Sequence, residues 1–201
     1  MIIIDYDTGN LASIKNMLQQ VGCSPIISED PDLISKSDEL ILPGVGNFKR
    51  GIESLRSKNL DKAIMKAINN NARLLGVCLG MQLLFDKSEE GECEGLKLIK
   101  GQVLKFNFKD NKLKIPHMGW NNVIFNKDSE LYFKYKEKQK FYFAHSYYVK
   151  CESKNNIAAM SKYGIEFSSA VQNKKIYGVQ FHPEKSHNFG KYFFKNFYKN
   201  N

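Results

Sequence analysis

Short apolar segments alternate with helical segments through the first half of the chain, and this alternation restricts the fold more than any other feature. The apolar segments are residues 1–6, 24–28, 39–44 and 73–77. Between them, two helical faces are predicted by Leu11, Ile14, Leu18 and Val21, and by Leu60, Ala63, Ile64, Ala67 and Ile68. Continuously apolar strands separated by helices are typical of a parallel sheet covered on both faces. Ligands of such sheets bind at the carboxyl ends of strands, where Pro43-Gly44 and Cys78 lie.

The second half of the chain reads as successive strands closed by one helix. Strands are expected at residues 98–106, 119–125, 141–149, 157–163, 166–172 and 175–181. Residues 79–87 are expected to be helical, and Phe189, Phe193 and Phe197, spaced by four residues, predict a closing amphipathic helix. We therefore predict an α/β fold in one domain over residues 1–201. Its mostly parallel sheet is flanked by helices and carries an appended antiparallel layer.

The positive charge of the chain invites a nucleic-acid function, but its residue types argue against one. The formal net charge is +9, from 30 Lys and Arg against 21 Asp and Glu, and only three of the basic residues are Arg. Bidentate recognition of bases and phosphates favours Arg, so we predict no nucleic-acid partner. No apolar run approaches the roughly 20 residues of a membrane span, and Met1 to Asp5 is too short for a signal core. A cytoplasmic protein without membrane association is expected.

The cysteines do not predict a disulfide or a metal site. Four are present, and they are widely spaced: Cys23, Cys78, Cys93 and Cys151. There is no Cys-x-x-Cys pair of the kind that structural zinc sites use. We therefore expect neither a metal nor another cofactor.

One of these cysteines lies in a sequence suited to nucleophilic catalysis. Gly76-Val77-Cys78-Leu79-Gly80 is G-x-C-x-G between a predicted strand and a predicted helix, the cysteine form of a nucleophile elbow. A helix start favours the thiolate, and the Leu79 N–H can donate to an oxyanion. The alternative is a buried structural thiol, which is common for free cysteine.

A cysteine nucleophile needs a base and a group that orients the base. His182 follows a predicted strand, and Glu184 lies two residues further on, with Pro183 between them. We predict that His182 is the base and that Glu184 holds the far nitrogen of its imidazole. A surface turn with unrelated side chains is the alternative.

A third candidate element is Pro43-Gly44-Val45-Gly46, after the strand at residues 39–44. Its two glycines allow backbone N–H groups to turn toward an anion. An ordinary strand-to-helix loop is the alternative.

Taken together, residues 43–46, the Cys78 elbow with the following GMQLL, and QFHPEKS (180–186) resemble the class I, triad-type glutamine amidotransferases. Four further stretches resemble one branch, the glutaminase subunits of imidazole glycerol phosphate synthase. They are DYDTGNLASI (5–14), SEEG (88–91), KIPHMGWN (114–121) and FAHSYY (143–148). The resemblance covers nearly the whole chain and implies the flavodoxin-like class I glutamine amidotransferase fold.

The resemblance implies a glutaminase mechanism and assigns residues to it. Cys78 attacks the side-chain amide of glutamine, His182 shuttles the proton to the leaving ammonia, and Glu184 orients the imidazole. Water then hydrolyses the thioester. The implied oxyanion hole comprises Val45, Gly46 and Leu79. The implied substrate contacts are Gly44, Gln82, Ser146 and Tyr147.

The resemblance also implies a partner. Family members pass ammonia to a separate (β/α)₈-barrel synthase (cyclase) subunit in a heterodimer, for histidine biosynthesis. Trp120 and Lys185 resemble interface positions, although Trp120 could instead be a core aromatic residue. The family more often has glycine where Asp7 stands, which adds a charge near the glutamine site or the interface.

Three other functions remain open from the sequence. A related glutaminase could supply ammonia to a synthase that aminates a sugar nucleotide for surface glycans. The chain could also be a non-catalytic regulatory subunit, or a cysteine peptidase or isomerase on the same fold.

Overall fold

The computed structural model describes residues 1–108, 113–133 and 138–199. Its helices are α1 (Leu11–Gln20), α2 (Pro31–Ser35), α3 (Phe48–Ser57), α4 (Leu60–Asn69), α5 (Leu79–Leu83) and α6 (His187–Lys199), with 3₁₀ turns η1 (Lys154–Asn156) and η2 (Pro183–Lys185). Strands of the first half are β1 (Ile2–Ile4), β2 (Ile26–Ser28), β3 (Glu39–Leu42), β4 (Arg73–Val77), β5 (Phe85–Ser88) and β6 (Cys93–Glu94). The remaining strands are β7 (Ile99–Lys105), β8 (His117–Asn122), β9 (Ile124–Phe125), β10 (Lys140–His145), β11 (Tyr147–Cys151), β12 (Ile157–Tyr163), β13 (Ile165–Asn173) and β14 (Ile176–Val179).

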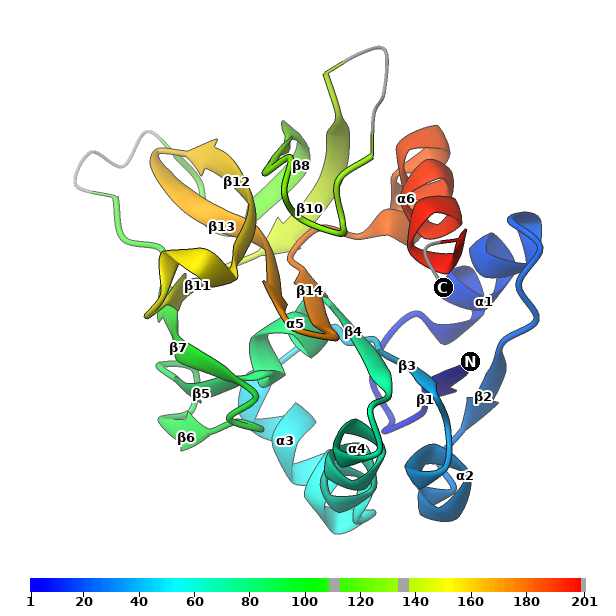
Figure 1. Cartoon of the computed structure of the whole chain (residues 1–201). Helices are drawn as coiled ribbons and strands as arrows, with labels where there is room; N and C mark the ends of the chain where they lie inside the picture. The colour runs from blue at the N-terminus through cyan, green and yellow to red at the C-terminus, as the bar shows by residue number, and fades with distance from the viewer. Residues whose placement is uncertain (109–112, 134–137, 200–201) are drawn as a thin grey trace.

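One large sheet runs through the molecule in the order β2-β1-β3-β4-β14-β13-β11-β7-β5-β6 (Figure 1). Its neighbours from β2 to β14 are parallel, and from β14 through β13 and β11 to β7 they are antiparallel. Strand β12 pairs with β13, and β9 pairs with β12, whereas β8 and β10 form a separate antiparallel pair. The predicted fold class, a mostly parallel sheet with flanking helices and an antiparallel layer, is confirmed.

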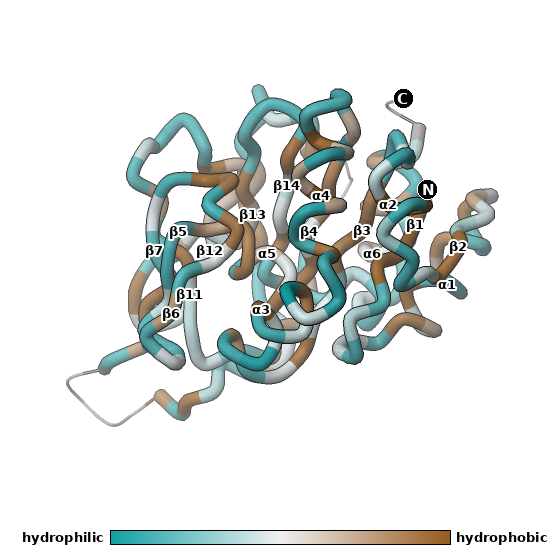
Figure 2. The backbone as a smooth tube through the Cα atoms, turned by 90° about the horizontal axis from the view of Figure 1, so that it is seen from below, coloured by the Kyte–Doolittle hydropathy of each residue, from teal (hydrophilic) through white to brown (hydrophobic). Residues whose placement is uncertain are grey.

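Helices cover both faces of the parallel part because its strands are apolar on both faces. Ile2 and Ile4 enter one buried cluster and Ile3 enters the other, as expected when successive side chains point to opposite faces. Helices α3, α4 and α5 contribute to the first cluster, whereas α1 and α6 contribute to the second. The hydrophobic colour along β1 and β3 in Figure 2 follows from this burial on two sides.

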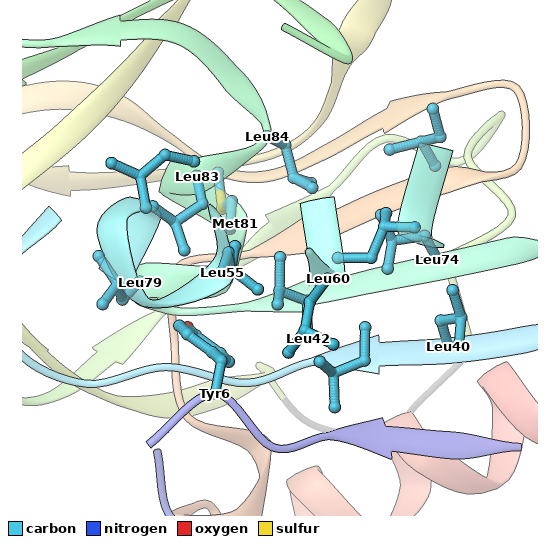
Figure 3. Close-up of a cluster of buried hydrophobic side chains, with 14 of the residues drawn as sticks. Tyr6, Leu40, Leu42, Leu55, Leu60, Leu74, Leu79, Met81, Leu83 and Leu84 are labelled. Carbon is cyan, nitrogen blue, oxygen red and sulfur yellow. The ribbon is translucent and has the colours of Figure 1, made fainter. Parts of the chain in front are cut away.

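The first cluster lies next to the nucleophile elbow. Figure 3 shows Leu42 of β3, Leu74 of β4 and Leu79 of α5 within this cluster. All three side chains are at most 2% exposed. Helix α5, which follows Cys78, is therefore held in place because Leu79 packs in the same buried cluster as Leu42 and Leu74.

Tertiary pairing changed several expected elements. The helix expected over residues 79–87 ends at Leu83, because β5 pairs in parallel with β7. The strand expected over residues 141–149 is interrupted at Ser146, and its halves, β10 and β11, belong to different sheets. The strand expected over residues 119–125 begins at His117 and is likewise divided, into β8 and β9.

Candidate active site

Cys78 occupies a sharp turn between β4 and α5. Its backbone angles, φ 54° and ψ −107°, lie in a region that side chains rarely adopt, as expected of a nucleophile elbow. A Cβ placed on Gly76 would come within 2.6 Å of the Gly80 carbonyl oxygen, so the turn requires glycine there. The Cys78 side chain is 5% exposed and lines a cavity.

The sheet order brings His182 to Cys78 from the far end of the chain. Strand β14 pairs in parallel with β4, and the Cys78 N–H donates to the Val179 carbonyl at 2.8 Å. Three residues later, the His182 N–H donates to Tyr142 of β10 at 2.8 Å. Adjacent parallel strands end at the same edge of a sheet, which places His182, the predicted base, beside the elbow.

Glu184 contacts the far nitrogen of the imidazole, as its position in the sequence predicts. His182 Nδ1 lies 2.8 Å from Glu184 Oε1, and the two side chains are 2% and 1% exposed. Burial disfavours the imidazolium, but the adjacent Cys78 sulfur and the Glu184 carboxylate outweigh this effect and raise the pKa of His182 to about 10. At neutral pH, a protonated imidazole therefore lies beside the Cys78 sulfur.

The predicted oxyanion donors surround the same cavity, but one is already engaged. Val45, Gly46 and Leu79 all line the cavity. The Leu79 N–H donates to the Gly44 carbonyl at 3.3 Å. The preceding carbonyl, of Pro43, accepts from the buried Tyr6 hydroxyl.

Gly44 fits this segment because there is no space for a side chain. An added Cβ would lie 2.8 Å from Leu79 Cβ and 3.0 Å from the Gly80 nitrogen. Residues 43–46, which follow β3, thus pack directly against the first turn of α5. The Leu79 N–H can donate to an oxyanion, as predicted, only if the Gly44 carbonyl moves away from it.

The cavity above Cys78 has a volume of about 440 Å³. Gln82, Ser146 and Tyr147 contribute to its lining, as the resemblance implies for substrate contacts. Gln82 Nε2 donates at 3.1 Å both to the Tyr147 carbonyl and to Gln180 Oε1. This arrangement leaves Gln82 Oε1 to accept from a ligand.

Two functional candidates escaped the sequence reasoning. Gln180 is fully buried, and its Nε2 lies 3.8 Å from Cys78 Sγ. The sequence feature that could have indicated it is its position just after β14, two residues before His182 and therefore on the same face of the extended segment. Glu90 supplies a carboxylate to the cavity, and its Oε2 accepts from the Phe48 N–H at 2.7 Å. Its signal was the SEEG stretch, to which no role was assigned.

Trp120 and Lys185 both lie at the surface. Trp120 is 47% exposed and stacks on His187 with ring centroids 5.6 Å apart, so it is not a core aromatic residue. Lys185 is exposed and lines the cavity, with Nζ 5.9 Å from the Tyr142 ring.

Asp7 adopts the backbone conformation for which glycine is usual. Its φ is 64°, in the left-handed region, which Asp tolerates better than most residues. Its carboxylate contacts Lys58 Nζ at 2.8 Å and Ser54 Oγ at 3.3 Å, and the Lys58 contact lowers the pKa of Asp7. The added charge is thus paired with Lys58.

Two surveys of the structure bear on other functions. Within the described ranges, no helix combines the length and apolar character needed to cross a bilayer. Across that same part of the chain, no group of three or more His, Cys, Asp or Glu side chains is arranged to hold a metal ion.

The fold and the Cys78–His182–Glu184 arrangement define a class I glutamine amidotransferase, and residues 2–201 match the family described as "Glutamine amidotransferase class-I". The chain belongs to this family. It is 51% identical to imidazole glycerol phosphate synthase subunit HisH 2 of Methanococcus maripaludis, over 98% of both chains. It is 44% identical to subunit HisH of Sulfurimonas denitrificans, over 98% of this chain and 96% of that protein.

Solved structures support the fold at much lower sequence identity. A crystal structure of glutamine amidotransferase covers 97% of each chain with a TM-score of 0.75 and 15% identity. The structure of PurLQS from Thermotoga maritima covers 98% of this chain and 94% of that one, with a TM-score of 0.74 and 21% identity.

Proposed function

We propose that this chain is the glutaminase subunit of an imidazole glycerol phosphate synthase. It hydrolyses glutamine to glutamate and ammonia as a single domain over residues 1–201, without a cofactor, in the cytoplasm. The observation that carries the proposal is the buried His182–Glu184 pair beside the elbow Cys78, with Cys78 and His182 both lining the cavity. Relatives named as HisH subunits, matched over almost their whole length, support the choice of synthase.

The chemistry proceeds through a thioester. Cys78 Sγ attacks the side-chain amide carbon of glutamine, and the imidazolium of His182 donates its proton to the departing ammonia. His182 then takes a proton from water, whose oxygen attacks the thioester carbon; glutamate leaves and the sulfur is restored. Glu184 holds the imidazole orientation throughout.

The cavity suits the amino-acid end of glutamine. Its α-ammonium needs acceptors, and Gln82 Oε1 and the Glu90 carboxylate are available on the lining. Ser146 and Tyr147 lie on the same lining, where the strand breaks between β10 and β11.

The oxyanion hole forms when residues 43–46 rearrange. Rotation of the Gly44 peptide frees the Leu79 N–H and brings a second donor from Val45 or Gly46 to the oxyanion. Loss of one such donor costs about 10²–10³ in rate. The chain alone is therefore a weak glutaminase, and a partner that stabilises the rotated segment at residues 43–46 activates it.

The partner is a (β/α)₈-barrel synthase subunit, bound as a heterodimer. Exposed apolar side chains lie at the cavity, with Val45 at 43% and Met118 at 64% exposed, and Trp120 is the next outward residue of β8. Apolar surface of this kind marks an interaction site. Trp120 and Lys185 lie at that interface, and ammonia passes there for histidine biosynthesis.

Reconstitution tests the proposal. The purified chain, mixed with a histidine-pathway barrel subunit and its ribonucleotide substrate, should release glutamate and form imidazole glycerol phosphate together. A glutamine-analogue electrophile should label Cys78 in the wild type and leave Cys78→Ala unlabelled. If only a sugar-nucleotide synthase stimulated glutamate release, the glycan alternative would replace the histidine assignment.

A further inference from the structure

A buried chain of hydrogen bonds leads from strand β8 to the glutamine cavity. Asn121 Nδ2 lies 3.2 Å from His117 Nε2, and His117 Nδ1 lies 3.0 Å from His145 Nε2. His145 Nδ1 in turn lies 2.8 Å from the Tyr147 carbonyl oxygen. Residues 117 and 145 face each other across the β8–β10 pair, so strand register brings the two rings together.

The partners at the two ends determine which nitrogen of each ring carries hydrogen. The Tyr147 carbonyl only accepts, so His145 Nδ1 must donate and the Nε2 of a neutral ring must accept. His117 Nδ1 is therefore the donor between the rings, and His117 Nε2 accepts from Asn121. The Asn121 amide is oriented independently, because its Nδ2 also donates to the Lys162 carbonyl at 2.9 Å.

The surroundings keep both imidazoles neutral. His117 and His145 are 3% and 5% exposed, and His117 stacks on Phe143 and on Tyr163, whose ring centroids lie at 4.8 and 4.1 Å. Burial lowers the pKa of His117 to about 4 and that of His145 to about 3. The donor pattern therefore persists at neutral pH.

The last hydrogen bond of this series, at the Tyr147 carbonyl, involves an atom that also contacts a residue of the proposed substrate site. The Tyr147 carbonyl accepts both from His145 and from Gln82 Nε2. Because Gln82 gives its Nε2 hydrogens to the Tyr147 carbonyl and to Gln180, its Oε1 is the acceptor left for the ligand. The Tyr147 carbonyl, together with Gln180 Oε1, thus governs which atom Gln82 presents to the cavity.

We infer that His117 and His145 are positioning residues for glutamine: the pair fixes the Tyr147 carbonyl, which holds Gln82 with its oxygen toward the substrate ammonium. This inference rests on the proposed glutaminase function. It also connects strand β8 to the glutamine site. Successive side chains of a strand point to opposite faces, so one face of β8 can contact the site while the other faces outward. Met118 and Trp120 face outward, whereas His117 and Asn121 lie on the opposite face of β8, where they take part in the hydrogen bonds described above.

The hydrogen positions are tested without any activity measurement. Long-range ¹H–¹⁵N NMR spectra of the full chain at neutral pH should show the Nδ1–H tautomer for both His117 and His145. An Nε2–H tautomer or a protonated ring at either position would overturn the inference.

Kinetics of the complex with its synthase partner test the positioning role. His117→Phe preserves the ring stack but removes the donor to His145, so the KM for glutamine should rise roughly tenfold while kcat changes less. His117→Asn keeps a donor near the position of Nδ1 and should restore much of the affinity. Tyr163→Phe is the matched control and should keep the wild-type KM. It removes a hydroxyl that donates to the Lys114 carbonyl and takes no part in the hydrogen bonds between Asn121 and Tyr147.

Three kinetic outcomes have distinct meanings. An unchanged KM in a folded His117→Phe variant would overturn the positioning role, as would an equal rise in KM in all three variants. A wild-type complex without glutaminase activity would instead refute the proposed function, and the NMR test would still decide the hydrogen positions.

Discussion

The Leu79 N–H donates to the Gly44 carbonyl at 3.3 Å, so the predicted oxyanion donor is bonded to the protein's own backbone. The Tyr6 hydroxyl holds the adjacent Pro43 carbonyl. The His182–Glu184 pair is therefore formed, whereas the Leu79 N–H is still bonded to the Gly44 carbonyl. A rearrangement of residues 43–46 would be needed to free this N–H.

Removal of the Tyr6 hydroxyl should weaken the closed arrangement of residues 43–46. In Tyr6→Phe the Pro43 carbonyl loses a donor, and a lost buried hydrogen bond is worth about 1–3 kcal/mol. We expect the partner-free glutaminase rate to rise by roughly tenfold and the stimulation by the partner to shrink. Tyr177→Phe, which loses a hydroxyl bonded to Glu130, is the control and should leave the partner-free rate unchanged. A partner-free rate equal to wild type in Tyr6→Phe would contradict this prediction.

The pH dependence should report the charged neighbours of His182. Its pKa of about 10 exceeds the ordinary 6.5, so the imidazolium persists at neutral pH and is lost as pH rises through 10. Activity should fall on that alkaline limb because the proton donor to ammonia disappears. In Glu184→Gln the pKa should decrease, and kcat should fall by about 10²–10⁴. NMR titration of the His182 ring, with a pH–rate profile, measures both; an unchanged titration would contradict the role of Glu184.

Gln180 should position the nucleophile. Gln180→Leu removes the group 3.8 Å from Cys78 Sγ and the acceptor for Gln82 Nε2, so kcat/KM should fall roughly tenfold or more. Gln172→Leu is the control. The Gln172 Oε1 accepts from Ser129 Oγ rather than contacting the site, so this variant should keep kcat/KM near wild type. Equal steady-state kinetics for the two variants would remove Gln180 from the site.

The apolar surface near the cavity should govern assembly. Trp120→Ala removes a half-exposed aromatic side chain from β8 and should raise the dissociation constant of the heterodimer by at least tenfold, since interface aromatics often contribute about 2 kcal/mol or more. Ile26→Ala truncates a residue that is 60% exposed on edge strand β2 and serves as control. Calorimetric titration with the barrel subunit measures both, and similar affinities for the two variants would place the interface elsewhere.

The cluster in Figure 3 should dominate stability. Leu74 is fully buried on β4, so Leu74→Ala should lower the free energy of unfolding by about 2–5 kcal/mol. Leu33→Ala removes the same atoms from a side chain that is 50% exposed and should cost much less. Urea denaturation followed by circular dichroism compares them; equal losses would show that burial does not set the cost.

Local patterns predicted more of the fold than of its connections. The continuous apolar strands indicated two-sided burial, and Ile3 does face a different cluster from Ile2 and Ile4. The break at Ser146 had no local signal, because both halves of residues 141–149 are suited to strands. Which sheet each half joins depends on pairing with β8 and with β7, two segments distant in sequence.

The sequence alone determined the chemistry that this chain can carry: the elbow glycines around Cys78, and the spacing of His182 and Glu184, which brings Nδ1 to a carboxylate at 2.8 Å. These features are local, so steric and spacing rules suffice to read them. Only the tertiary structure decided that β14 lies beside β4, that Gln180 contacts the sulfur, and that the Gly44 carbonyl occupies the Leu79 N–H. Such contacts join residues far apart in the chain, and they follow from how the whole sheet packs rather than from any short pattern.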